Sequence, residues 1–177
     1  MDRRIVKTKR RIRDAFLALR RRYSDDKIKV KDICAEAKIN KTTFYKHYED
    51  SEELSEEIDE ALAEGVVSSF CERESLFDYP EQYVEGLTEA IERETNELEV
   101  VYRGRREILC AKLEEKLRKI YDYTEAHTER RVISSFIIGG VLRVLIDRIF
   151  TNKNDRCDKK TLLNSLIKMV RRVIPAT

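Results

Sequence analysis

The residues best suited to chemistry stand close together in one short segment. They offer amide, hydroxyl, phenol, ammonium and imidazole groups: Asn40, Lys41, Thr42, Thr43, Tyr45, Lys46 and His47. Groups of these kinds form hydrogen bonds with phosphate oxygens and with base edges in a major groove. The segment therefore predicts contact with a nucleic acid.

A helix over this segment separates inward from outward side chains. Phe44 and Tyr48 stand four residues apart, so they share one face and would enter a small core. Asn40 precedes the helix, where its side chain can accept a hydrogen bond from the amide of residue 42 or 43. The opposite face then carries Thr42, Thr43 and Lys46. Tyr45 and His47 lie on its two flanks.

Catalytic and metal chemistry find little support elsewhere. His47 and His127 are the two histidines, and the GxSxG, P-loop, GxGxxG and HExxH motifs do not occur. The cysteines are widely separated and form no CxxC pair, which argues against a zinc module and a disulfide framework. We expect no enzyme activity, no catalytic residue, no metal and no cofactor. The cysteines are expected to be reduced thiols: Cys34, Cys71, Cys110 and Cys157.

Charge is distributed unevenly along the chain. Residues 1–50 carry 16 Lys and Arg against 8 Asp and Glu, whereas residues 51–177 carry 20 against 26. Phosphate neutralisation by cations drives nucleic-acid binding, so a polyanionic partner at the basic end is one interpretation. Charge alone fits a solvated tail equally well.

Composition predicts an all-α fold in a chain of 177 residues with 40% charged residues, five Gly and two Pro. The basic start is followed by further charges rather than by an apolar stretch, so no signal peptide is expected. The longest apolar run, from Phe136 to Leu142, is too short to cross a bilayer. These features predict a soluble, cytoplasmic protein that does not bind membranes.

Apolar spacing predicts the following helices. The first is basic, with an apolar face that runs from Ile12 to Tyr23, and a short second helix places Val30 and Ala37 on one face. The third follows Asn40. The later helices are expected over residues 51–64, which are acidic and begin with Ser51 as a cap, and over residues 80–95, 97–123 with an interruption near Gly104, 125–150 and 158–174.

The last two helices are apolar enough to predict a homodimer. Residues 132–150 are apolar around most of the helix, so they are covered on more than one side. A partner subunit is one cover, although an ordinary buried core helix without a dimer remains open. The interface is predicted at Ile133, Phe136, Ile137, Gly140, Val144, Leu163, Leu166, Ile167 and Val170.

Residues 7–54 resemble the DNA-binding domain of TetR-family transcriptional regulators. The similarity is closest in VKDICAEAKINKTTFYKHY, residues 30–48, which is followed by DSEEL. The resemblance implies a three-helix helix-turn-helix DNA-binding domain over 1–50. It also implies a helical ligand-binding and dimerisation bundle over 51–177. The implied DNA contacts are Lys29, Lys31, Asn40, Lys41, Thr42, Thr43, Tyr45, Lys46 and His47.

As in that family, the chain is expected to be a ligand-responsive repressor that binds a palindromic double-stranded DNA operator as a dimer. An unidentified small-molecule effector would change the separation of the two DNA-binding domains through the acidic fourth helix. Aromatic residues beyond residue 51 are pocket candidates, although they fit a core equally well: Phe70, Tyr83, Tyr102 and Tyr121.

The sequence departs from the family pattern at four positions. Lys38 replaces the usual turn glycine, which predicts an unfavourable backbone conformation costing about 1 kcal/mol. Thr42 replaces a common glycine, Lys29 stands where a Ser or Thr cap is frequent, and Ser51 replaces a lysine that reaches a phosphate. These departures keep open a co-regulator that binds a protein partner rather than DNA.

Overall fold

The computed structural model describes residues 3–24, 27–70, 76–120, 128–151 and 157–174. Every regular element in these ranges is a helix, so the predicted all-α class is confirmed for them. Contacts divide the chain into two compact units, Met1–Ala61 and Leu62–Thr177, here called the first unit and the second unit. The functional domain limits, 1–50 and 51–177, stay a prediction.

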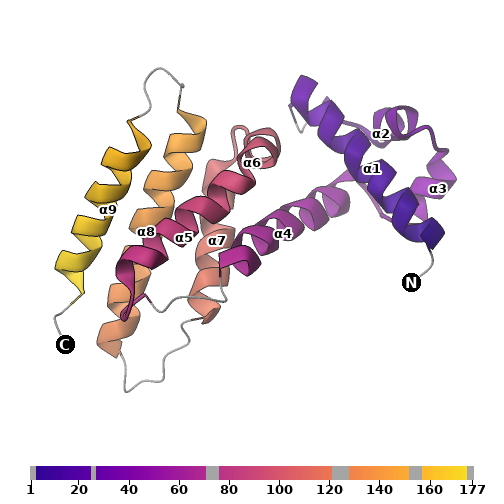
Figure 1. Cartoon of the computed structure of the whole chain (residues 1–177). Coiled ribbons are helices and arrows are strands. Elements are labelled where there is room, and N and C mark those ends of the chain that lie inside the picture. Colours follow the sequence, from indigo (N-terminus) through magenta and orange to yellow (C-terminus); the bar gives the residue numbers. More distant parts are fainter. Residues whose placement is uncertain (1–2, 25–26, 71–75, 121–127, 152–156, 175–177) are drawn as a thin grey trace. The chain divides into compact units, whose positions relative to one another are not determined.

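Three helices and the start of a fourth form the first unit (Figure 1): α1 (Arg3–Arg22), α2 (Val30–Ala37), α3 (Lys41–Tyr45) and α4 (Ser51–Phe70). α1 packs on α2, and α2 packs on α3. The prediction that Tyr23 lies on the apolar face is wrong. The helix ends at Arg22, and Tyr23 is 51% exposed. The core of the unit includes Ile12, Phe16, Leu19, Ile33 and Phe44.

The start of α4 differs from the prediction. Ser51 is already the first helical residue, so it does not cap the helix. Asp50 Oδ1 instead accepts the backbone N–H groups of Glu52 and Glu53, each at 2.8 Å. A carboxylate at this position satisfies amides that lack helical partners and complements the positive end of the helix dipole. The helix also continues to Phe70, past its predicted end at Glu64.

The second unit holds the end of α4 and five further helices: α5 (Pro80–Arg93), α6 (Thr95–Val101), α7 (Arg106–Ile120), α8 (Thr128–Phe150) and α9 (Lys159–Val173). Pro80 occupies the first turn of α5, where its missing N–H has no helical partner to lose. Gly104 adopts φ +75° between α6 and α7, which confirms the predicted interruption. Asp158 caps α9 by accepting the Thr161 N–H at 3.1 Å.

α8 is the central helix of the second unit because it contacts α5, α6, α7 and α9. The side chains that face these neighbours are buried, among them Ile138, Leu142 and Ile146. Val132 and Phe136 on the same helix are 63% and 67% exposed. The predicted broad apolar surface is therefore covered over most of its extent and left open near the start of α8. Among the described helices, none has the length and apolar character needed to span a membrane.

Candidate nucleic-acid interface

α2 and α3 are joined by a short turn, and Asn40 fixes where α3 begins. Asn40 Oδ1 accepts the Thr43 backbone N–H at 2.7 Å and the Thr43 hydroxyl at 2.7 Å. This confirms the predicted cap. α3 has five residues, too few for a helix to persist by itself in water, so the cap and the packing beneath it maintain its shape.

The turn before α3 tolerates a lysine where a glycine would be expected. Lys38 lies in the left-handed region at φ 54° and ψ 48°, which confirms the predicted strained backbone. The Arg11 guanidinium, from α1, donates to the carbonyl oxygens of Ala37 at 2.6 Å and Lys38 at 3.0 Å. These hydrogen bonds hold the turn in place, so the departure from glycine does not abolish the helix-turn-helix.

The inward side of α3 is anchored by aromatic residues. Phe44 is 0% exposed and Tyr48 is 2% exposed, which confirms that both enter the core. The Phe44 ring meets the Tyr45 ring edge-on, with centroids 5.6 Å apart and planes at 90°. Tyr45 itself is 55% exposed. The packing of Phe44 thus positions a phenol on the outer surface.

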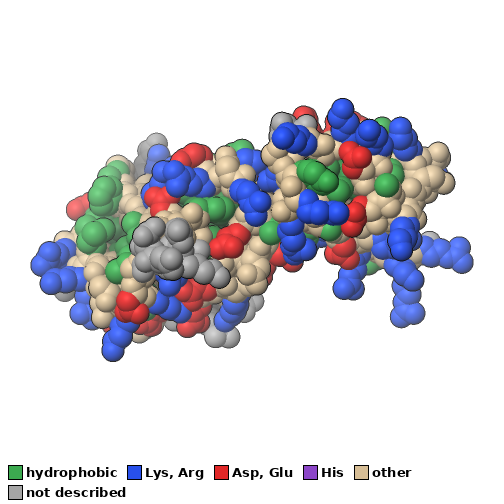
Figure 2. All heavy atoms as spheres, turned by 90° about the horizontal axis from the view of Figure 1, so that it is seen from above, with side chains coloured by type: hydrophobic (Ala, Val, Ile, Leu, Met, Phe, Trp, Pro, Cys, Tyr) green, Lys and Arg blue, Asp and Glu red, His purple; other side chains and the backbone are tan. Residues whose placement is uncertain are grey.

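The predicted DNA-contacting residues lie together on the first unit, and most are exposed. Lys29 is the N-cap residue of α2, but its side chain has no oxygen that could accept a helix amide. The Asp32 carboxylate accepts the Lys29 backbone N–H at 3.3 Å. In Figure 2, Lys and Arg side chains gather over the part of the molecule that contains α1 to α3. The exposed set is Lys29, Lys31, Asn40, Lys41, Thr42, Tyr45 and Lys46, with Thr43 and His47 partly exposed.

A cluster that the sequence analysis missed connects α1, the segment just after α3, and α4. Glu57 Oε1 accepts the Tyr48 hydroxyl at 2.8 Å, and Glu57 Oε2 accepts Lys9 Nζ at 2.5 Å. Lys9 Nζ also lies 5.0 Å from the centre of the Tyr48 ring. These residues are 9 and 48 positions from Glu57 in sequence, so helical spacing did not indicate that they would meet.

The cluster shifts the pKa values of its members. Burial and the hydrogen bond to Glu57 raise the pKa of Tyr48 well above its usual 10. Burial alone would raise the pKa of Glu57. The hydrogen bonds from Lys9 and Tyr48 outweigh it, so this pKa falls below its ordinary 4.5. The carboxylate therefore remains charged at neutral pH and holds the three elements together.

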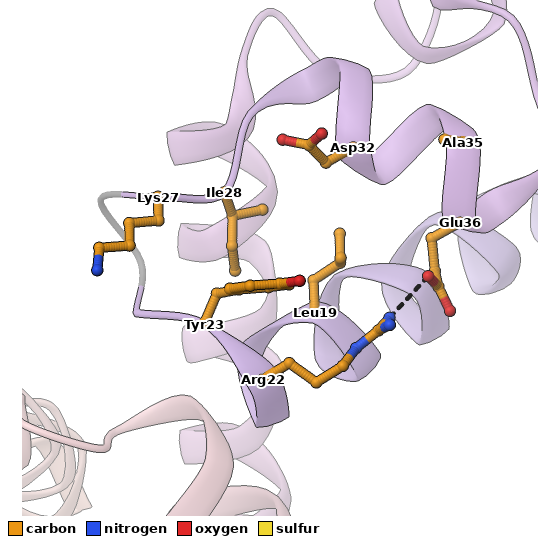
Figure 3. A pocket seen from close by; sticks show the side chains of 8 residues that line it. All are labelled: Leu19, Arg22, Tyr23, Lys27, Ile28, Asp32, Ala35 and Glu36. Atoms are coloured by element: carbon orange, nitrogen blue, oxygen red, sulfur yellow. Dashed lines mark hydrogen bonds and ion pairs between the residues drawn. The ribbon is translucent and has the colours of Figure 1, made fainter.

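A groove of about 560 Å³ lies at the C-terminal end of α1 (Figure 3). The Arg22 guanidinium and the Glu36 carboxylate form an ion pair across part of it at 2.7 Å. α3 contributes no side chain to the lining, and the two carboxylates would repel phosphate. We therefore treat the groove as separate from the interface. Its lining is Leu19, Arg22, Tyr23, Lys27, Ile28, Asp32, Ala35 and Glu36.

The residues predicted for a dimer interface fall into two groups. Ile137, Leu166 and Val170 are buried within the protomer, so they offer no surface to a partner. A Cβ added at Gly140 would meet nothing within 4 Å, whereas at Gly139 it would lie 3.2 Å from Glu114 Oε1. The available residues, which are partly or fully exposed, are Ile133, Phe136, Gly140, Val144, Leu163 and Ile167.

The aromatic pocket candidates are packed side chains. Phe70 and Tyr83 meet edge-on with ring centroids 4.8 Å apart, and Tyr83 and Tyr102 are each 0% exposed. Phe70 also borders a cavity of about 230 Å³ with Gln82, Glu85 and Arg93 among its other lining residues. Tyr121 lies outside the described residues. No group of three or more candidate metal ligands occurs among the residues that are described.

Comparison with known proteins identifies the fold. No protein-family profile and no curated protein matches the sequence. The structure is similar to that of a TetR transcriptional regulator from Streptococcus agalactiae 2603V, with a TM-score of 0.65 and 24% sequence identity. The match covers 96% of this chain and 96% of that chain. The chain thus has the fold of a TetR transcriptional regulator over nearly its whole length.

Proposed function

We propose that this chain, with the fold of a TetR transcriptional regulator, is itself a regulator that binds double-stranded operator DNA in a sequence-specific manner. The observation that carries the proposal is the two-sided construction of α3. Phe44 fixes the inner side in the core, and Thr42, Tyr45 and Lys46 occupy the outer side. Hydroxyl, phenol and ammonium groups are suited to base edges and to phosphates.

The surroundings of α3 support the same function. Lys29 and Lys31 stand exposed at the start of α2, where long cationic side chains can reach phosphates beside the groove that α3 enters. The capping of α3 by Asn40 and the anchoring of its turn by Arg11 fix the helix before DNA arrives. A fixed helix loses little conformational freedom on binding, which favours affinity.

The proposal includes a homodimer that binds a palindromic site. Val132 and Phe136 leave an apolar patch uncovered at the start of α8. Gly140 lies on the same helix and has open space beside it, so a helix of the second copy could approach α8 closely there. Two copies related by a twofold axis would present two α3 helices to two half-sites. We also propose that a small-molecule effector, bound in the second unit, shifts the dimer between states of different DNA affinity.

The first test is selection from a random pool of DNA duplexes at fixed salt. The wild type should enrich a palindrome, and the Tyr45→Ala, Lys46→Ala double variant should not. Loss of the outer contacts should lower affinity for the selected site roughly 10- to 100-fold, the size expected for one or two specific contacts. Tyr79→Ala with Lys119→Ala is the matched control, because it removes an exposed tyrosine and an exposed lysine from the second unit.

Enrichment by the wild type and the control alone would support sequence-specific DNA binding through α3. Equal enrichment by the Tyr45, Lys46 variant would show that another surface contacts DNA. Failure of the wild type to enrich any sequence would contradict the proposal. It would favour the co-regulator that binds a protein partner instead.

A further inference from the structure

We infer that a cationic stripe on α1, formed by Arg3, Lys7 and Arg10, binds backbone phosphates of DNA outside the groove that α3 enters. The inference rests on the proposed function and extends it to a second contact surface. The stripe is a set of side chains on one helix face. At 100° per residue the three positions fall within an arc of about 60°.

Within the described part of the chain, the fold makes little use of this stripe. The first fully buried residue of α1 is Ile12, and residues 3–7 are all exposed. Other cations of α1 serve the structure: Lys9 binds Glu57, and Arg11 binds the carbonyl groups of the turn before α3. Arg10 lies 3.8 Å from Asp14, but the two side chains are 82% and 65% exposed, so this pair contributes little.

The stripe is also unfavourable for the helix itself. α1 has no acidic residue in its first turn, where the helix dipole is positive and a carboxylate would be stabilising. Arg3 places a positive charge there, and Lys7 and Arg10 add like charges along the same face. A local arrangement that opposes folding without a compensating contact is expected at a functional surface.

The stripe lies close to the proposed DNA site within the first unit. Arg11 contacts the turn before α3, and Lys9 lies against Tyr48 just after α3, so residues 9–11 are level with that helix. Residues 3–7 continue along α1 beyond this level. From Arg3 to Arg10 the helix rises about 10 Å, roughly the length of three phosphate-to-phosphate steps on one strand.

The orientation of the stripe favours phosphates over bases. Lys9 and Arg11 occupy the sides of α1 that face the end of α3 and the preceding turn, and the stripe lies on the remaining outer side. Side chains on that side cannot enter the groove together with α3. They are expected to meet the backbone next to it, without regard to sequence.

Salt dependence of DNA binding tests the inference. The triple variant Arg3→Gln, Lys7→Gln, Arg10→Gln keeps good helix formers and removes three charges. Each lost phosphate contact lowers the slope of log K against log salt by about 0.9, so the slope should fall by about 2.7 for each bound protomer. Between 50 and 200 mM salt, the wild type should then lose about 40-fold more affinity than the variant for each bound protomer.

The same measurement is made on the selected operator and on a random duplex, and the slope should fall equally on both. The matched control Arg93→Gln, Arg103→Gln, Lys119→Gln removes three exposed charges from the second unit and should leave the slope unchanged. If circular dichroism shows that the triple variant is unfolded, Arg3→Gln alone replaces it, with an expected slope change of about 0.9.

An unchanged slope in the stripe variant, with normal DNA binding by the wild type, would overturn this inference and leave the proposed function intact. A change confined to the operator would also overturn it, because the stripe would then be reading bases. A wild type that binds neither duplex above background would overturn both the inference and the proposed function.

Discussion

At the scale of single residues, Lys38 is a non-glycine residue with a left-handed backbone conformation. Its φ of 54° belongs to the region that glycine adopts readily and that a side chain disfavours. We expect Lys38→Gly to raise the free energy of unfolding by about 1 kcal/mol, measured by urea denaturation. Lys38→Ala retains the strain, so it should give no such gain. Equal stabilisation by both variants would show that the lysine charge, and not the backbone, is responsible.

Substitution of Asn40 should have the opposite effect and lower stability, because the native residue suits its position as the cap of α3. Asn40→Ala removes the oxygen that accepts the Thr43 N–H, and the free energy of unfolding should fall by about 1 kcal/mol. Asn40→Asp keeps the acceptor and should stay close to the wild type. Urea denaturation of the two variants at neutral pH measures the difference. An alanine variant as stable as the wild type would mean that water replaces the cap.

Sequence reasoning succeeded at these residues because their signals are local. A cap is recognised from the residue before the helix, and the strain at Lys38 follows from its position in a tight turn. It failed at Ser51, since Asp50 next to it is an equally good capping residue and spacing alone did not separate the two. It also failed at Tyr23, because the exact end of an amphipathic helix is not marked by periodicity.

At the scale of elements, the contacts between helices were not accessible from the sequence. The order of the helices and the break at Gly104 follow from apolar spacing and turn residues. The cluster of Lys9, Tyr48 and Glu57 depends on α1, α4 and the segment after α3 meeting in space, and no periodic pattern encodes that meeting. The chain's local chemistry thus predicted the elements, whereas their tertiary contacts required the structure.

The cluster predicts how stability responds to acid. The folded pKa of Glu57 lies below 4.5, so its contribution is complete above that pH and is lost as the pH falls through the folded pKa. Glu57→Gln should lower the free energy of unfolding at pH 7 by about 1 kcal/mol or less, because the carboxylate is 49% exposed. The difference from the wild type should shrink below about pH 4.

Urea denaturation at pH 7 and at about pH 3.5 checks this dependence. The neighbouring exposed residue supplies the control, since Glu56→Gln removes a carboxylate that lies outside the cluster. A stability difference between wild type and Glu57→Gln that is the same at both pH values would refute an ionic role for Glu57.

At the scale of the whole molecule, the exposed apolar patch of α8 predicts self-association. Phe136→Asp should leave folding of the protomer intact, because that side chain is 67% exposed, and should weaken the dimer at least about tenfold. Sedimentation equilibrium measures the dimer dissociation constant. Ile108→Asp, at an exposed apolar position of α7 outside the predicted interface, is the control. Unchanged association by Phe136→Asp, or a monomeric wild type, would place the α8 patch outside any dimer contact.

The two-sided construction of α3 also bears on how such a protein can diverge. Substitutions at Thr42 and Lys46 alter only outward groups and are expected to change stability by less than about 0.5 kcal/mol. Phe44, by contrast, is completely buried, so its replacement would disturb the fold. Under the proposed function, target preference can therefore drift during evolution through a few surface changes while the scaffold is conserved. Duplicated copies of the gene could acquire separate sets of targets without first passing through an unstable intermediate.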